Sequence, residues 1–232
     1  MTIREAPLGI LMLDTRFPRL PGDIGNPRTW PFPVLYKVVA SASPTAAVED
    51  DARKLLPAFV SAGRELVAAG CNGVVTSCGF LALVQDDLRS ALGVPVATSA
   101  LLQVEMVAAT LAPGRRVGIL TISAHSLTSA HLRAAGVPEG TPVMGMDRGG
   151  AFASAILEDR ESFDMDAARD EIVAAAEALV REAGDIGAVV LECTNMAPFA
   201  ADVADRLGLP VYSMNSLVTW FRAGLIPPSD FP

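Results

Sequence analysis

An internal repeat limits this chain to a fold built from two similar halves. Gly73-Val-Val-Thr-Ser-Cys78 aligns with Ala188-Val-Val-Leu-Glu-Cys193 at an offset of 115 residues. At the same offset, without a gap, Leu92-Gly-Val-Pro-Val96 aligns with Leu207-Gly-Leu-Pro-Val211. A further match, between Leu8-Gly-Ile-Leu11 and Val117-Gly-Ile-Leu120, opens each half at an offset of 109 residues. Self-similarity over this length indicates a repeated structural unit.

Apolar runs and helical patterns alternate along both halves. The apolar runs are short enough for buried parallel strands and cover Leu8–Leu13, Gly73–Thr76, Val94–Ala97, Arg116–Thr121, Ala188–Leu191 and Leu209–Tyr212. Helical spacing of apolar residues occurs in Pro44–Ala69, Val84–Leu92, Leu101–Leu111, Ser126–Ala135, Asp166–Ala183 and Pro198–Leu207. Ser126 and Asp166 are expected N-caps. This alternation predicts an α/β fold with parallel sheets.

The repeat and the alternation together predict two similar lobes. Each lobe is a parallel sheet flanked by helices, and a pseudo-two-fold axis relates the two, with the active site between them. We expect residues 1–99 with 215–232 in the first lobe and residues 100–214 in the second.

Two of the three cysteines lie at equivalent positions of the repeat, where a strand ends and a helix begins. Open α/β sheets bind ligands at such strand ends, and a helix N-terminus stabilises a thiolate or a substrate carboxylate. If Cys78 and Cys193 face one cleft, one thiolate can remove a proton from a carbon while the other thiol protonates the opposite face. The alternative is that both are only small buried residues. Cys71 has no partner at the offset and is interpreted as structural.

Composition and charge exclude several classes of function. The net charge is −8 and no run of Lys or Arg occurs, so nucleic acid is not an expected partner. The N-terminus lacks the pattern of a signal peptide, and no apolar stretch is long enough for a membrane span, so we expect a cytoplasmic protein that does not bind membranes. An odd number of cysteines speaks against disulfides, and no zinc-binding spacing is present, so no metal is expected.

The chain resembles the aspartate/glutamate/hydantoin racemase superfamily along nearly its whole length. The resemblance is carried by the segments around Cys78 and Cys193, by the Cys193-Thr194 pair and by Leu13-Asp14-Thr15. It implies two lobes with the site between them, no cofactor, and the two cysteines as the catalytic acid/base pair. It also implies that Asp14 orients or tunes the first thiol.

Two departures from the superfamily pattern concern substrate recognition. Gly79-Phe80 follows the first cysteine, where Asn-Thr is typical, and Asn195 stands where His or Glu is typical. The usual contacts to an amino-acid head group are therefore partly missing.

Further residues are expected to contact the substrate because they flank the cysteines or end the equivalent strands. These candidates are Ser77, Gly79, Phe80, Thr121, Ser123, Thr194 and Asn195. The proline-rich segment Thr15–Pro33 is long enough to cover the cleft, although a rigid surface loop is the alternative. His125 is a weaker candidate base, because a position beside a helix cap explains it equally well.

The sequence thus predicts a cofactor-independent racemase or epimerase that inverts the α-carbon of an amino acid or a derivative by a two-base mechanism. The expected substrate is a small carboxylate or a hydantoin-like molecule. The same fold also supports a maleate isomerase or an arylmalonate decarboxylase-like enzyme, and the second cysteine argues against the decarboxylase. A non-catalytic two-lobed binding protein is the alternative from another class. The sequence leaves the formation of a homo-oligomer open.

Overall fold

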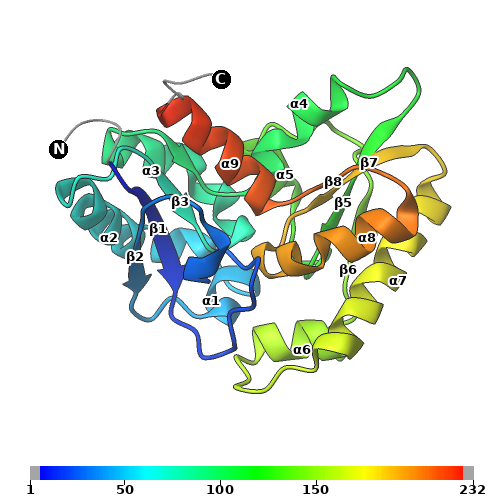
Figure 1. Ribbon diagram of the computed structural model, residues 1–232, viewed down its shortest axis with the longest axis horizontal. Coiled ribbons are helices and arrows are strands. Elements are labelled where there is room, and N and C mark those ends of the chain that lie inside the picture. Colours follow the sequence, from blue (N-terminus) through cyan, green and yellow to red (C-terminus); the bar gives the residue numbers. More distant parts are fainter. Residues whose placement is uncertain (1–5, 227–232) are drawn as a thin grey trace.

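The computed structural model describes residues 6–226 and contains two parallel four-stranded sheets (Figure 1). Their strand orders are β2-β1-β3-β4 and β6-β5-β7-β8, so each strand of the first sheet has a counterpart in the second. The strands are β1 (Leu8–Leu13), β2 (Val34–Val39), β3 (Val74–Thr76), β4 (Val96–Ala97), β5 (Arg116–Thr121), β6 (Val143–Gly145), β7 (Ile186–Leu191) and β8 (Val211–Tyr212). The predicted α/β fold with two similar lobes is confirmed.

The two sheets also share their register. In the first sheet Gly9 pairs with Val74, and in the second Gly118 pairs with Val189. The next strand follows the same rule, because Val74 pairs with Val96 and Val189 with Val211. The offsets of 109 and 115 residues seen in the sequence are therefore the offsets between equivalent strands. The carboxyl ends of β3 and β7 hold equivalent places in the two sheets.

Helices pack on both sheets and connect the strands. They are α1 (Pro44–Val48), α2 (Leu56–Ala68), α3 (Gln85–Leu92), α4 (Val104–Ala108), α5 (Ser129–Ala134), α6 (Ala151–Leu157), α7 (Met165–Ala183), α8 (Ala200–Leu207) and α9 (Met214–Leu225). Short 3-10 helices are η2 (Pro27–Thr29), η3 (Ala52–Leu55), η4 (Gly79–Val84), η5 (Ala100–Gln103) and η6 (Thr194–Phe199).

The structure corrects three local predictions. The pattern over Pro44–Ala69 is not one helix, because η3 separates α1 from α2. The N-cap of α5 is Thr128 and that of α7 is Asp164, so the predicted caps Ser126 and Asp166 are wrong. Asp164 Oδ1 accepts the Ala167 N–H in the first turn of α7, and the Thr128 N–H donates to His131 Nδ1 in a capping box at the start of α5.

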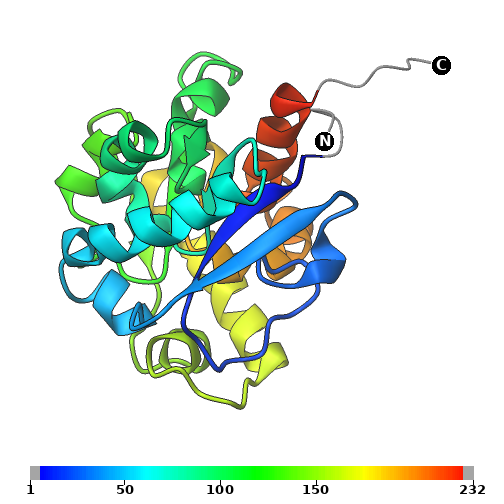
Figure 2. The same cartoon turned by 90° about the vertical axis from the view of Figure 1, so that its left-hand side faces the viewer.

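Helix α9 covers the face of the first sheet that α2 and α3 leave open (Figure 2). Its residues Met214, Leu217 and Val218 are buried in one apolar cluster with Ile10 and Val75. Burial at this spacing orients one stripe of the helix toward the sheet. The chain thus returns to the first sheet after β8, while the lobe boundaries at residues 99 and 214 remain our proposal.

Within residues 6–226, none of the helices is long and apolar enough to cross a membrane.

Candidate active site

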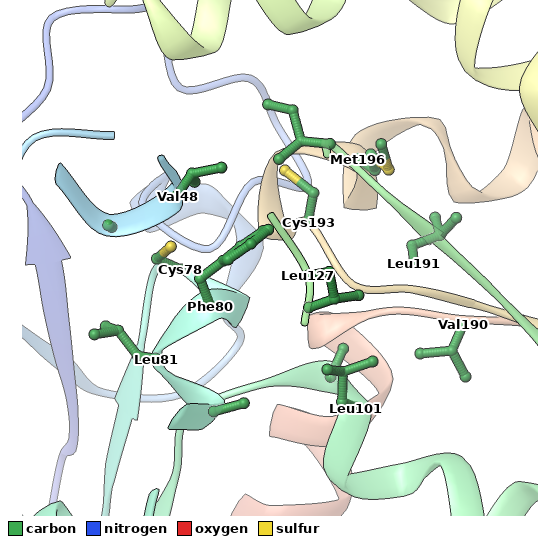
Figure 3. Packing of buried hydrophobic residues seen from close by; sticks show 14 of the residues in the cluster. Val48, Cys78, Phe80, Leu81, Leu101, Leu127, Val190, Leu191, Cys193 and Met196 are labelled. Atoms are coloured by element: carbon green, nitrogen blue, oxygen red, sulfur yellow. The ribbon is translucent and has the colours of Figure 1, made fainter. Parts of the chain in front are cut away.

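Cys78 and Cys193 line one cavity at the carboxyl ends of β3 and β7. Figure 3 shows the two side chains among the buried residues that surround them. Each is the N-cap of the 3-10 helix that follows, Cys78 of η4 and Cys193 of η6. The cavity is small, with a volume of about 20 Å³. The repeat therefore brings the two thiols to a shared space, which is the arrangement expected for lobes related by a pseudo-two-fold axis.

The cavity wall is mainly apolar and comes from both lobes. Its apolar members are Leu13, Phe17, Pro44, Val48, Phe80, Ile122 and Ile156. Its polar members, apart from the cysteines and Gly79, are Arg19, Ser77, Glu192, Thr194 and Asn195. Such a lining suits a small molecule with apolar groups and a few polar handles.

Both thiols are protonated in the unliganded protein. Burial raises the pKa of Cys78 to about 12, and the nearby Glu192 contributes in the same direction. Burial also raises the pKa of Cys193 well above its ordinary value, with further contributions from Glu192 and Asp23. Backbone N–H groups at the helix ends lower both pKa values, in the expected direction, but desolvation outweighs them.

The two thiols differ in how readily a thiolate can form. Backbone N–H groups of Phe80 and Leu81 and the charge of Arg19 lower the pKa of Cys78. Cys193 has one such backbone donor, from Asn195. Cys78 is therefore the better placed of the two to become the thiolate once the charge of a ligand offsets the cost of burial.

Hydrogen bonds connect the two cysteine segments directly. The Thr194 hydroxyl donates to the carbonyl oxygen of Ser77 (2.7 Å), so its hydrogen already forms a bond between the two lobes. The Ser77 hydroxyl accepts the Leu13 N–H (2.9 Å) and keeps its own hydrogen for a ligand in the cavity.

Glu192, which was not among the sequence candidates, is fully buried in the cavity wall beside Cys193. Its Oε2 accepts the Thr121 hydroxyl (2.7 Å), and its Oε1 has no hydrogen-bond partner. Desolvation raises the pKa of Glu192 to about 7, against the opposing Thr121 hydrogen bond. In the sequence, Glu192 stands out only through the repeat. It is a charged residue at the end of an apolar run, at the position equivalent to Ser77.

Gly79 provides the space that Glu192 occupies. A Cβ at position 79 would lie 2.1 Å from Glu192 Oε1 and 2.5 Å from the Glu192 carbonyl oxygen. Any side chain here would collide with the segment that carries Cys193. Gly79, which stands where Asn is typical of the superfamily, thus leaves room for the buried side chain of Glu192.

The segment Thr15–Pro33 reaches the cavity and contacts the second lobe. Phe17 and Arg19 line the cavity, and the Arg19 guanidinium lies 4.4 Å from the centre of the Phe17 ring. The backbone N–H groups of Arg16 and Phe17 donate to Asp159 Oδ1 in the loop after α6 (2.6 and 3.3 Å). These contacts place the segment over the cavity.

A partly buried hydrogen-bond network joins the segment to Cys193. Arg19 donates to Asp23 (3.2 Å), and the Asn195 side-chain amide donates to the other Asp23 oxygen (2.8 Å). The Cys193 thiol donates to Asn195 Oδ1 (3.8 Å). Asn195 therefore links the Cys193 thiol to Asp23.

The structure places some predicted residues away from the cavity. Asp14 is exposed and is not part of the cavity wall, so its predicted role at the first thiol has no support. The Ser123 hydroxyl donates to Ser126 in the turn before α5 instead of lining the cavity (3.0 Å). Thr121 is buried and does not line the cavity, and its hydroxyl donates to Glu192, which does.

The two histidines and Cys71 do not line the cavity. His125 is exposed and outside the cavity, and His131 completes the N-terminal cap of α5. Cys71 is buried outside the cavity and packs against Gly9 of β1. In the described part of the chain, no group of three His, Cys, Asp or Glu side chains could hold a metal ion.

Curated relatives of similar sequence are lyases. The chain is 26% identical to dimethylsulfoniopropionate lyase of Durusdinium sp. clade D over 97% of this chain and 76% of that protein. It is 29% identical to dimethylsulfoniopropionate lyase 5 of Emiliania huxleyi over 93% of this chain. That match spans only 45% of the Emiliania protein.

Solved structures share the fold. Unliganded arylmalonate decarboxylase matches with a TM-score of 0.59 and 16% identity, over 97% of this chain and 94% of that one. Allantoin racemase from Pseudomonas fluorescens matches with a TM-score of 0.54 and 15% identity, over 97% of this chain and 98% of that one. The family model described as Asp/Glu/Hydantoin racemase matches residues 45–221. This chain belongs to the Asp/Glu/hydantoin racemase family.

Proposed function

We propose that this chain is a cofactor-independent lyase that removes a proton from the α-carbon of a small carboxylate and expels a sulfonium group from the β-carbon. Dimethylsulfoniopropionate is the substrate that we propose to test first. The observation that carries the proposal is a pair of buried thiols on one apolar cavity with a single arginine in the described part of its wall. We propose a sulfonium leaving group because the similar lyases are named for dimethylsulfoniopropionate.

In the proposed reaction, the Cys78 thiolate takes one α-proton. The electron pair of that C–H bond forms the Cα–Cβ double bond, and the Cβ–S bond breaks with its electrons on sulfur. The products are acrylate and dimethyl sulfide, and the Cys78 proton later returns to solvent. No oxidant, reductant or second substrate is needed.

The lining of the cavity suits the two ends of such a zwitterion. Arg19 and the Ser77 hydroxyl are donors for the carboxylate. A dimethylsulfonium group has no N–H to satisfy, so Phe17 and Phe80 can pack against its methyl groups and attract its charge. That positive charge also favours formation of the thiolate, because it offsets the desolvation that keeps both thiols protonated.

Racemisation is a second candidate, and the second thiol favours it. Cys193 lines the same cavity as Cys78, so it can return a proton to an α-carbon that carries no leaving group. A substrate with a β-sulfonium would undergo elimination, and a chiral α-carbon without one would be inverted.

A substrate panel separates these activities. The purified protein would be incubated in deuterated water with dimethylsulfoniopropionate, amino acids and hydantoins, each in a separate reaction. We expect acrylate by proton NMR and dimethyl sulfide by gas chromatography from the first substrate. Deuterium at the α-carbon of an amino acid or hydantoin without elimination would instead establish the racemase. A panel with neither product nor exchange would contradict both proposals.

Arg19 should contribute to substrate binding through the carboxylate. Arg19→Met leaves the buried Asp23 without its cation, so the informative variant is Arg19→Met combined with Asp23→Asn. We expect kcat/KM of this double variant to fall about 10- to 100-fold, the range for loss of a hydrogen bond to a charged group. Asp23→Asn alone is the control, and wild-type kcat/KM in the double variant would show that Arg19 does not bind the substrate.

A further inference from the structure

Glu192 is a buried acid in the cavity wall whose second oxygen has no partner. The carboxyl group is 0% exposed, and Oε1 forms no hydrogen bond in the described structure. Buried polar atoms in native proteins are nearly always hydrogen-bonded, so an orphan atom in a cavity wall indicates a missing partner. Glu192 and Gly79, against which Oε1 packs, both belong to that wall.

The surroundings of Glu192 favour its neutral form. The titratable groups that sense its charge are the two thiols, and Arg19 in the same cavity wall is already paired with Asp23. Negative charge on Glu192 would oppose a thiolate at either cysteine, because both thiols sense it. Desolvation accordingly raises the pKa of Glu192 to about 7.

The hydrogen bonds of Thr121 indicate which oxygen carries the proton. In the described structure Glu192 Oε2 is the one acceptor within reach of the Thr121 hydroxyl, which therefore donates its hydrogen there (2.7 Å). Oε2 is then the carbonyl oxygen of the neutral acid, and Oε1 bears the hydrogen. The unpartnered atom is therefore a hydrogen-bond donor.

We propose that Glu192 is a substrate-binding residue that works as a neutral carboxylic acid and donates its Oε1 hydrogen to the carboxylate of the substrate. The proposal rests on the proposed function only in taking the substrate to be a carboxylate. Above neutral pH the acid loses this proton, and its negative charge then repels both the substrate carboxylate and the thiolate. Recognition of a carboxylate should consequently weaken as the pH rises through about 7.

Alkylation of the active-site thiols tests this without any substrate. Iodoacetate carries a carboxylate and iodoacetamide does not, and both react with the same thiolate, so the ratio of their rates cancels thiol ionisation. The rates would be measured from pH 5.5 to 8.5 by mass spectrometry of the Cys78 and Cys193 peptides, in a Cys71→Ser background. For wild-type Glu192 we expect the iodoacetate-to-iodoacetamide ratio to fall by about tenfold from below to above the pKa.

Three variants make the test specific. Glu192→Gln keeps the shape, the Thr121 contact and a donor without titrating, so its ratio should stay high and flat with pH. Glu192→Leu removes the donor, so its ratio should be low at every pH. Glu177→Gln, on the surface beside Arg206, is the matched control and should follow the wild type. Circular dichroism would establish that each variant is folded.

A flat ratio in the wild type would overturn the proposal. So would a pH-dependent fall that persists in Glu192→Gln, because another group would then titrate, or a low ratio in Glu192→Gln at every pH. Since the probe needs no turnover, these outcomes are distinct from failure of the lyase proposal, which the substrate panel measures separately.

Discussion

Replacement of Cys78 by serine is expected to lower elimination by about a hundredfold or more, within the range for loss of a general base. A serine hydroxyl is a far poorer base than a thiol at neutral pH, and Cys78 has the better environment for a thiolate. Cys193→Ser should affect elimination less, because only one proton is removed. Racemisation of a chiral substrate should be lost in both variants, since inversion needs a group on each face of the carbon. Initial rates of acrylate release and chiral chromatography provide the two measurements.

Cys71→Ser is the control, because Cys71 is buried outside the cavity. It should have wild-type rates. Full elimination activity in Cys78→Ser together with a large loss in Cys193→Ser would reverse the assignment of the base. Full activity in both variants would show that neither cysteine takes part in the reaction.

Gly79→Ala should be the most damaging substitution of a residue that has no functional side chain. The new Cβ would lie 2.1 Å from Glu192 Oε1 and 2.5 Å from the Glu192 carbonyl oxygen, so the two cysteine segments must separate. Overpacking of this kind costs about 1–3 kcal/mol of unfolding free energy. A displacement of about 1 Å at the reacting groups lowers activity by about a hundredfold. Denaturant unfolding and kcat/KM measure the two effects.

Gly224→Ala is the matched control, because no atom lies within 4 Å of a Cβ built at this position in α9. It should leave activity unchanged and slightly stabilise the helix. Glu192→Ala should restore only part of the stability of Gly79→Ala, because the main-chain oxygen still collides. Wild-type stability and activity in Gly79→Ala would show that the segments are not packed as the structure has them.

The sequence predicted those parts of the fold that are periodic or repeated. β1, β3, β4, β5, β7 and β8 coincide with short apolar runs. For β1, β3, β5 and β7 the reason is that central strands of a parallel sheet are buried on both faces. Two of the four edge strands were missed: β2 carries Lys37 and exposed side chains, and β6 is three residues long with partly buried side chains. Helices α6 and α9 were missed as well.

The site was predictable where it lies within the repeat and unpredictable where it depends on loop paths. Cys78, Cys193, Ser77 and Thr194 line the cavity because equivalent strand ends come together. Asp14 directly follows β1, but its side chain is exposed, and apolar periodicity does not report the direction of a side chain beyond the strand. The path of residues 15–33 likewise carries no periodic signal, so the sequence did not single out Arg19 from the other arginines in that segment.

The central claim is that the two thiols share one cavity and act on one substrate carbon. The stoichiometry of alkylation in the Cys71→Ser variant tests it most directly, by intact-mass measurement after exhaustive treatment of the folded protein with iodoacetate. The carboxymethyl group on either thiol fills the space in front of the other, so we predict one modification per chain and parallel loss of activity. Two modifications per folded chain, at equal rates at Cys78 and Cys193, would show two independent thiols and contradict the shared site.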